Sequence, residues 1–120
     1  MKIKKVNKKN GYSVGVGGLN FEEQTRIKKL KLTIGTYQIE SFEDFHIGIW
    51  WNPVKKDYDC EKSQWLISFE KAYQLAKKRG ELAIWDWRNE REIWLIEQKD
   101  RKLLFCFKSK NFQFWIYEKK

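Results

Sequence analysis

Apolar and polar residues alternate over several stretches of this chain with the two-residue period of a β-strand that is buried on one face. In the first half of the chain the alternation predicts three such strands, over residues 26–34, 37–40 and 45–51. Pro53 ends the third strand, because proline has no N–H to donate to a neighbouring strand. Residues 52–62 then form a predicted polar loop that carries charges of both signs.

An N-terminal hairpin is predicted over residues 3–16. The pair Asn10-Gly11 favours a type I′ turn, in which both central residues have positive φ. The glycine-rich run at residues 15–18 lacks the lysine and hydroxyl residue of a phosphate-binding loop. Residues 1–25 are therefore expected to be a hairpin followed by a flexible connector.

One main helix is predicted over residues 63–79. Ser63 or Asp59 is the candidate N-cap, and Gly80 suits the position just after the last turn. Apolar side chains recur at the three- and four-residue spacing of one helix face, at Trp65, Phe69, Ala72 and Ala76.

The rest of the chain is predicted to be an antiparallel meander over residues 82–117. Its strand-like runs are residues 82–87, 93–97, 103–108 and 112–117, and the gaps between them are short and polar. With the helix packed on one face of the sheet, the expected fold class is α+β with about seven or eight strands. The chain has 120 residues, so we expect residues 1–120 to form a single domain.

Composition adds two observations. The chain contains seven Trp, eight Phe and five Tyr, more than a core of this size needs. Exposed aromatic side chains are favoured as anchors of protein interfaces. The net charge is +9 and comes mainly from lysine, which gives a diffuse field rather than bidentate phosphate contacts.

The sequence also predicts where the protein acts. No apolar run approaches the roughly 20 residues that span a bilayer. No apolar segment follows the charged N-terminus as it would in a secretory signal. Two cysteines, Cys60 and Cys106, make no disulfide framework and are expected to be reduced thiols. We therefore expect a cytoplasmic protein without membrane contact.

Few residues suit catalysis or metal binding. His46 is the only histidine and lies among apolar residues of a predicted strand, which is typical of a structural role. Histidine and cysteine are too few for a zinc site, and the acidic residues of 52–62 lack the spacing of a calcium loop. The sequence therefore predicts a binding protein with no catalytic residue, metal or cofactor.

Aromatic and acidic residues gather around the predicted polar loop. We interpret this group as a protein-binding surface, formed by Trp50, Trp51, Asp57, Tyr58, Asp59 and Glu61. Aromatic anchors desolvate well, and acids at the rim steer a basic partner. In the alternative, structural interpretation, Trp51 and Trp65 belong to the core between helix and sheet, and the acids cap the helix.

Several short motifs follow one another over roughly residues 30–107. They are Leu32-Thr33-Ile34-Gly35, Trp50-Trp51, Asp57-Tyr58, Gln64-Trp65 at the predicted helix start, and Ala83-Ile84-Trp85 and Ile93-Trp94-Leu95 in the meander. Their order resembles that in immunity proteins of bacterial contact-dependent growth inhibition systems. The chain departs from that pattern in a longer spacing before Trp65 and in its positive charge, since immunity to a nuclease favours an acidic surface. The resemblance implies a cytosolic inhibitor that binds one cognate toxin domain, which need not be a nuclease.

Binding of single-stranded nucleic acid is the alternative function. Bases stack on aromatic side chains of a sheet while lysines hold the phosphate backbone. The candidate residues are Lys29, Lys31, Lys108, Lys110, Trp115 and Tyr117. A small phage or mobile-element protein that binds a host factor would share most of these features.

Overall fold

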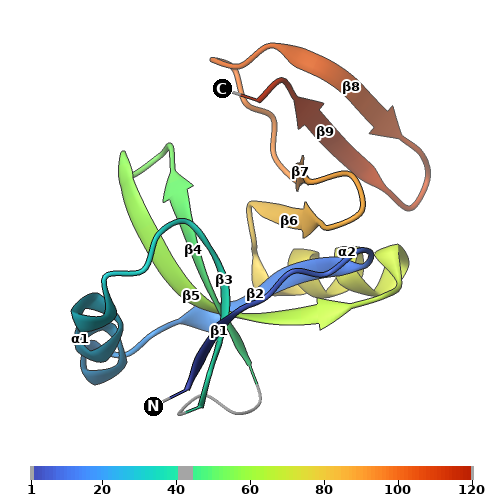
Figure 1. Ribbon diagram of the computed structural model, residues 1–120. Coiled ribbons are helices and arrows are strands. Elements are labelled where there is room, and N and C mark those ends of the chain that lie inside the picture. Colours follow the sequence, from blue (N-terminus) through green and yellow to red (C-terminus); the bar gives the residue numbers. More distant parts are fainter. Residues whose placement is uncertain (1, 41–44, 120) are drawn as a thin grey trace. The chain divides into compact units, whose positions relative to one another are not determined.

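The computed structural model describes residues 2–40 and 45–119, which contain nine strands and two helices (Figure 1). In chain order they are β1 (Ile3–Lys5), β2 (Tyr12–Gly18), α1 (Phe21–Leu30), β3 (Gly35–Ile39), β4 (His46–Asn52), β5 (Asp57–Leu66), α2 (Phe69–Arg79), β6 (Ala83–Asp86), β7 (Arg91–Trp94), β8 (Leu103–Lys108) and β9 (Gln113–Tyr117). Strands that pair within either compact unit of the chain are antiparallel. The predicted α+β class is confirmed, with more strands than expected and with a second helix.

The chain divides into two compact units. The first contains Met1–Asn7 and Gly15–Gln64, and the second contains Lys8–Val14 and Trp65–Lys120. Each unit has its own buried cluster of apolar side chains. The expectation of a single domain stays a prediction, and each unit is described by itself below.

The first unit is a sheet with strand order β1-β3-β4-β5. Its core joins α1 to the sheet through Leu19, Ile27, Tyr37, Ile39 and Ile47. Helix α1 begins with a capping box: the Glu23 N–H donates to Asn20 Oδ1 over 2.8 Å, and the Asn20 N–H donates to Glu23 Oε1 over 3.0 Å.

The strand predicted over residues 26–34 is wrong. Residues 26–30 belong to α1, and Lys31 is its C-cap in the left-handed region, with φ 51°. Alternation of Leu30 with Leu32 suggested a strand, yet both leucines pack against the core as the helix ends. The sequence does carry a signal for this helix, because Asn20 and Glu23 have the spacing of a capping box.

The N-terminal hairpin is also wrong. β1 pairs with β3, and β2 pairs with β6 within the second unit, in place of the predicted pairing within residues 3–16. Gly11 does adopt positive φ, at 84°. Its role is to admit the Trp65 ring, because a Cβ on Gly11 would lie 2.5 Å from Trp65 Cε2. The Trp65 Nε1–H donates to Asn10 O over 2.9 Å, and this hydrogen bond holds the ring against Gly11.

The predicted helix start and the predicted polar loop are both wrong for one reason. Residues 57–66 form β5, which pairs with β4, so the chain turns only over residues 53–56. Helix α2 begins after β5, where the Ser68 side chain caps it by accepting from the Lys71 N–H. Its end at Gly80 is as predicted, with φ 69°. Trp65 therefore lies in β5, beyond the last residue that pairs with β4, and not on the helix face that its spacing suggested.

The second unit has the strand order β2-β6-β7-β9-β8. The predicted meander is therefore wrong in its order, since β9 lies between β7 and β8. Ile116 and Tyr117 of β9 are buried, whereas all six residues of β8 are exposed. β9 thus takes the inner position, and the connection over residues 95–102 lets β8 lie outside it.

An aromatic cluster covers the sheet of the second unit beside α2. The Phe69 ring lies 5.4 Å from Tyr12, 5.5 Å from Phe112 and 5.4 Å from Phe114, measured between ring centroids. Tyr73 lies 5.0 Å from Phe112. Aromatic pairs at these distances contribute beyond their buried area, so this cluster anchors α2 on the sheet.

We expect Gly11→Ala to lower the free energy of unfolding by roughly 1–3 kcal/mol. The new Cβ meets the Trp65 ring, and alanine at φ 84° is strained. Urea unfolding followed by circular dichroism measures the loss. Gly18→Ala is the matched control, because a Cβ there meets nothing within 4 Å. Equal urea midpoints for the two variants would contradict the role assigned to Gly11.

Candidate functional site

The β4–β5 hairpin positions most of the residues predicted to bind a partner. The two strands pair in an unbroken register from His46↔Ser63 to Asn52↔Asp57. At the tip the Lys56 N–H donates to Asn52 O over 2.8 Å, and Lys56 adopts φ 56°. The tip is therefore a tight turn and not the open loop expected from the sequence.

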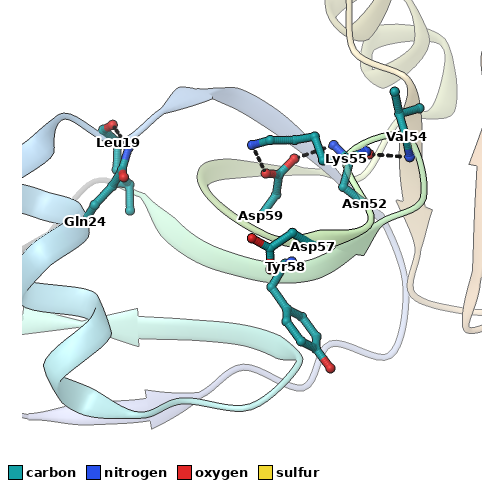
Figure 2. Close-up of polar contacts among 8 residues, drawn as sticks. All are labelled: Leu19, Gln24, Asn52, Val54, Lys55, Asp57, Tyr58 and Asp59. Atoms are coloured by element: carbon teal, nitrogen blue, oxygen red, sulfur yellow. Dashed lines mark hydrogen bonds and ion pairs between the residues drawn. The ribbon is translucent and has the colours of Figure 1, made fainter.

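A polar network holds this turn (Figure 2). Asn52 is 6 % exposed, and its Oδ1 accepts hydrogen bonds from the backbone N–H groups of Val54, over 2.9 Å, and Lys55, over 3.3 Å. The Asn52 Nδ2 donates to Asp59 Oδ2 over 2.6 Å, while Lys55 Nζ lies 2.6 Å from Asp59 Oδ1. Each polar group of the Asn52 amide thus has a partner, and the turn has one geometry.

Trp51 and Tyr58 form an exposed aromatic pair on this hairpin. They are directly opposite each other in the register, with ring centroids 5.2 Å apart and ring planes at 79°. Their exposed fractions are 45 % and 57 %. The Tyr58 ring points away from the side chains of Asn52 and Asp59 (Figure 2). This pair is a fixed apolar feature on the surface of the first unit.

The predicted surface is divided between the two faces of the hairpin. Successive residues of a strand point to opposite faces, and paired residues share a face. Trp51 and Tyr58 therefore lie on the face that also carries Ile47, the side of α1. Trp50 lies on the other face, half-buried, with Asp59 opposite it. Glu61 shares that second face, opposite Gly48.

The acidic residues have unequal roles. Asp59 is engaged by Asn52 and Lys55, so it stabilises the turn. Asp57 is exposed, and its Oδ1 accepts from the backbone N–H of Tyr58 over 2.7 Å. Asp57 is adjacent to Tyr58 along β5, but it pairs with Asn52 and so belongs to the face opposite the aromatic pair.

A groove separates the aromatic pair from α1. Its volume is about 410 Å³. The Gln24 Nε2 donates to Leu19 O over 2.8 Å at its helical side. Its lining combines the apolar Leu19, Ile27, Tyr58 and Cys60 with the polar or charged Gln24, Lys28, Lys55, Asp57, Asp59 and Glu61. The groove gives a partner side chain a place to enter next to Tyr58.

The Cys60 thiol in this groove is protonated at neutral pH. Burial raises its pKa to about 11, and the neighbouring carboxylates of Glu61 and Asp59 act in the same direction. The thiolate is the nucleophilic form of cysteine. Cys60 therefore contributes packing to the groove and not nucleophilic chemistry.

The residues predicted to bind nucleic acid fall into both units. Lys29 is in the last turn of α1 and Lys31 follows it, so neither lies on the strand face expected from the sequence. Tyr117 is 5 % exposed, and Arg101 lies over its ring at 5.7 Å. Trp115 is half-buried, while Lys108 and Lys110 are exposed. The Tyr117 ring is therefore not accessible for stacking with a base.

Two structural residues of the site were missed from the sequence, Asn52 and Lys55. The signal available was Asn52-Pro53, because asparagine before a turn hydrogen-bonds the backbone two or three residues on. Within residues 2–40 and 45–119, no group of three or more His, Cys, Asp or Glu side chains is placed to hold a metal ion. No helix of the described segments has the length and apolar character needed to cross a membrane.

A scan against protein-family models and searches of curated proteins and of solved structures found no match for this chain. The resemblance to immunity proteins therefore stays a prediction from the motifs.

We expect Asp59→Asn to destabilise the protein by about 1–2 kcal/mol at pH 7 and by less in acid. Burial raises the pKa of Asp59, but the hydrogen bonds from Lys55 and Asn52 outweigh burial and hold the pKa below its ordinary value of 3.8. The stabilisation is present above the unfolded pKa and is lost as pH falls through the folded pKa. Urea unfolding at pH 7 and near pH 3 measures the difference. Asp57→Asn is the control, and an Asp59→Asn effect independent of pH would refute this account.

We expect iodoacetamide to alkylate Cys106 at least about tenfold faster than Cys60 in the folded protein near pH 8. Cys106 is exposed, whereas Cys60 is half-buried with a raised pKa. Peptide mass mapping over time gives both rates. The urea-unfolded protein is the control, in which the two rates should converge. Equal rates in the folded protein would mean that Cys60 is open to solvent.

Proposed function

We propose that this protein is a non-catalytic inhibitor that binds a protein effector through the Trp51–Tyr58 aromatic pair. The observation that carries the proposal is the exposure of both rings, 45 % and 57 %, on a structured hairpin. Trp and Tyr are enriched among the residues that dominate binding free energy in protein interfaces.

The hairpin lowers the entropic cost of binding. Side chains and loops that become ordered on association reduce affinity. Here the Asn52 amide and the Asp59–Lys55 ion pair fix the turn before any partner arrives. The ring contact between Trp51 and Tyr58 also restricts both side chains. The aromatic pair is thus presented in one arrangement, as a binding surface requires.

The surroundings of the pair favour a partner with apolar and basic groups. The groove beside Tyr58 is lined by three carboxylates, those of Asp57, Asp59 and Glu61, and by two lysines, Lys28 and Lys55. Charged groups at a rim contribute mainly to the rate of association and to specificity. The partner expected here covers the exposed aromatic pair with apolar surface and places positive charge at the acidic groove.

The motif order supports a more specific class of partner. Trp50-Trp51 and Asp57-Tyr58, which resemble motifs of contact-dependent growth inhibition immunity proteins, both lie on this hairpin. We infer a cognate bacterial toxin domain as the effector and the cytoplasm as the place of binding.

The test uses the toxin domain encoded beside this chain's gene as the probe. Trp51→Ala or Tyr58→Ala should weaken binding by at least ~2 kcal/mol, measured by titration calorimetry, and should abolish protection in a growth assay. Phe21→Ala is the matched control, because Phe21 is an 85 % exposed aromatic residue of the same unit. Losses below about 0.5 kcal/mol for both hairpin variants would remove the aromatic pair from the interface.

The response to salt distinguishes nucleic-acid binding from the proposed binding of a protein. Contacts with phosphates weaken steeply as salt rises, through counterion release. We expect no micromolar binding of single-stranded RNA or DNA at about 200 mM salt. Binding that persists there would replace the inhibitor proposal with the lysine-based alternative.

A further inference from the structure

Strand β8 of the second unit exposes an unusual amount of apolar surface. Its residues are Leu103, Leu104, Phe105, Cys106, Phe107 and Lys108, and all six are exposed. Leu104 is 61 % exposed and Phe105 is 51 % exposed. Contiguous exposed apolar residues on a folded unit mark sites of interaction.

β8 is also the outer strand of its sheet (Figure 1). Among the described residues its strand partner is β9 alone. An edge strand presents unpaired backbone N–H and C=O groups, and proteins normally protect it with proline, inward charges or short length. Residues 103–107 contain neither proline nor a charged residue. The register with β9 is irregular between Leu103 and Phe105 and regular from Phe105 to Lys108. The edge of this regular part is therefore open to addition of another strand.

The exposed rings of β8 are held in place from beneath. Phe105 and Phe107 lie 6.3 Å and 5.2 Å from the Phe114 ring, which contacts Phe69 of α2 at 5.4 Å. The aromatic cluster of the second unit thus continues without interruption to the edge strand. A strand added beside β8 would extend this cluster and cover rings that are already ordered, so little side-chain entropy is lost.

Positive charge borders the strand at both ends. Lys102 precedes it with a 76 % exposed side chain, and exposed Lys108 and Lys110 follow its apolar part. The Lys102 ion pair with Glu118 is long, at 4.0 Å, and both side chains are exposed, so it neutralises little. An occupant of this edge is complementary when it has an apolar centre and carboxylates at its ends.

We propose that β8 accepts, by strand addition, an extended apolar segment of a partner protein that carries acidic residues at both ends. The open edge selects an extended backbone, the apolar side chains of β8 select the centre, and the lysines select the flanks. This surface lies in the second unit and is separate from the Trp51–Tyr58 pair, so it goes beyond the inhibitor proposal.

Two other occupants fit less well. If two copies paired centre to centre through β8, Lys102 of one copy would face Ser109 of the other, next to Lys108 of that copy. Like charges close together across a strand pair are unfavourable, and each copy has a net charge of +9. Single-stranded nucleic acid would gain stacking on Phe105 and Phe107, but it would leave the aliphatic Leu103 and Leu104 without a suitable contact.

The test uses two labelled peptides of about nine residues with the same valine- and isoleucine-rich centre. One peptide has glutamates at both ends and the other has lysines. We expect the glutamate peptide to bind and to slow hydrogen exchange of the β8 amides. The lysine peptide should bind at least about tenfold more weakly. Absence of β8 protection at about 1 mM glutamate peptide would overturn the proposal.

Leu104→Lys tests the location of the site. A lysine in mid-strand blocks strand addition, and Leu104 is exposed enough to accept the change without loss of the fold. Ile67→Lys is the matched control, because Ile67 is 59 % exposed in the same unit and outside β8. We expect at least about tenfold weaker peptide binding in Leu104→Lys and wild-type binding in Ile67→Lys. Equal binding by both variants would overturn the site, and the wild-type peptide comparison stands even if Leu104→Lys unfolds.

The alternative occupants have their own outcomes. A dimer in sedimentation velocity that Leu104→Lys dissociates would replace the partner segment with a second copy. Binding of single-stranded RNA at about 200 mM salt that Leu104→Lys abolishes would replace it with nucleic acid. Toxin binding through Trp51 should be unchanged in Leu104→Lys, so failure of one proposal is distinguishable from failure of the other.

Discussion

The candidate site depends on the hydrogen bonds of one buried amide, that of Asn52. A buried polar group without a hydrogen-bond partner is costly, so both the side-chain oxygen and the side-chain N–H group of Asn52 need partners. It does so with two backbone N–H groups of the turn and with the Asp59 carboxylate. These bonds fix where the chain reverses, and the reversal fixes the register of β4 and β5. That register is what places Trp51 opposite Tyr58.

The sequence was informative where one local signal dominated. β3, β4, β8 and β9 lie close to the strands expected from alternation, and α2 ends at Gly80. It was misleading where two signals competed. Trp65 fits a helical spacing, but it lies in β5, where its ring packs on Gly11 and its Nε1–H donates to Asn10 O. Around Leu30 a short alternation concealed a helix that is set by the capping box of Asn20 and Glu23.

The order of strands could not be read from the sequence for a different reason. The connections between β6, β7, β8 and β9 allow more than one antiparallel order, and β8 is as apolar as β9, so the sequence pattern does not choose between them. β9 contributes Ile116 and Tyr117 to the interior, whereas β8 stays exposed at the edge. In the site, the sequence grouped these residues around a loop, whereas the structure places them on one hairpin, and their division between two faces depends on the register. Trp50 and Trp51 are neighbours in sequence and lie on opposite faces.

The closed network at the hairpin tip has a consequence for how this protein can change during evolution. Asn52 and Asp59 hydrogen-bond each other, so substitution of either leaves a largely buried polar group of the other without this partner. These two positions are therefore expected to be replaced together, whereas Lys55, whose side chain is 63 % exposed, is less constrained. Trp51 and Tyr58 contact each other on the other face of the hairpin and take no part in this network. Substitution of either residue therefore leaves the network intact. The turn residues are thus constrained, whereas the aromatic pair is free to vary. Partner specificity can therefore change during evolution while the turn keeps its structure.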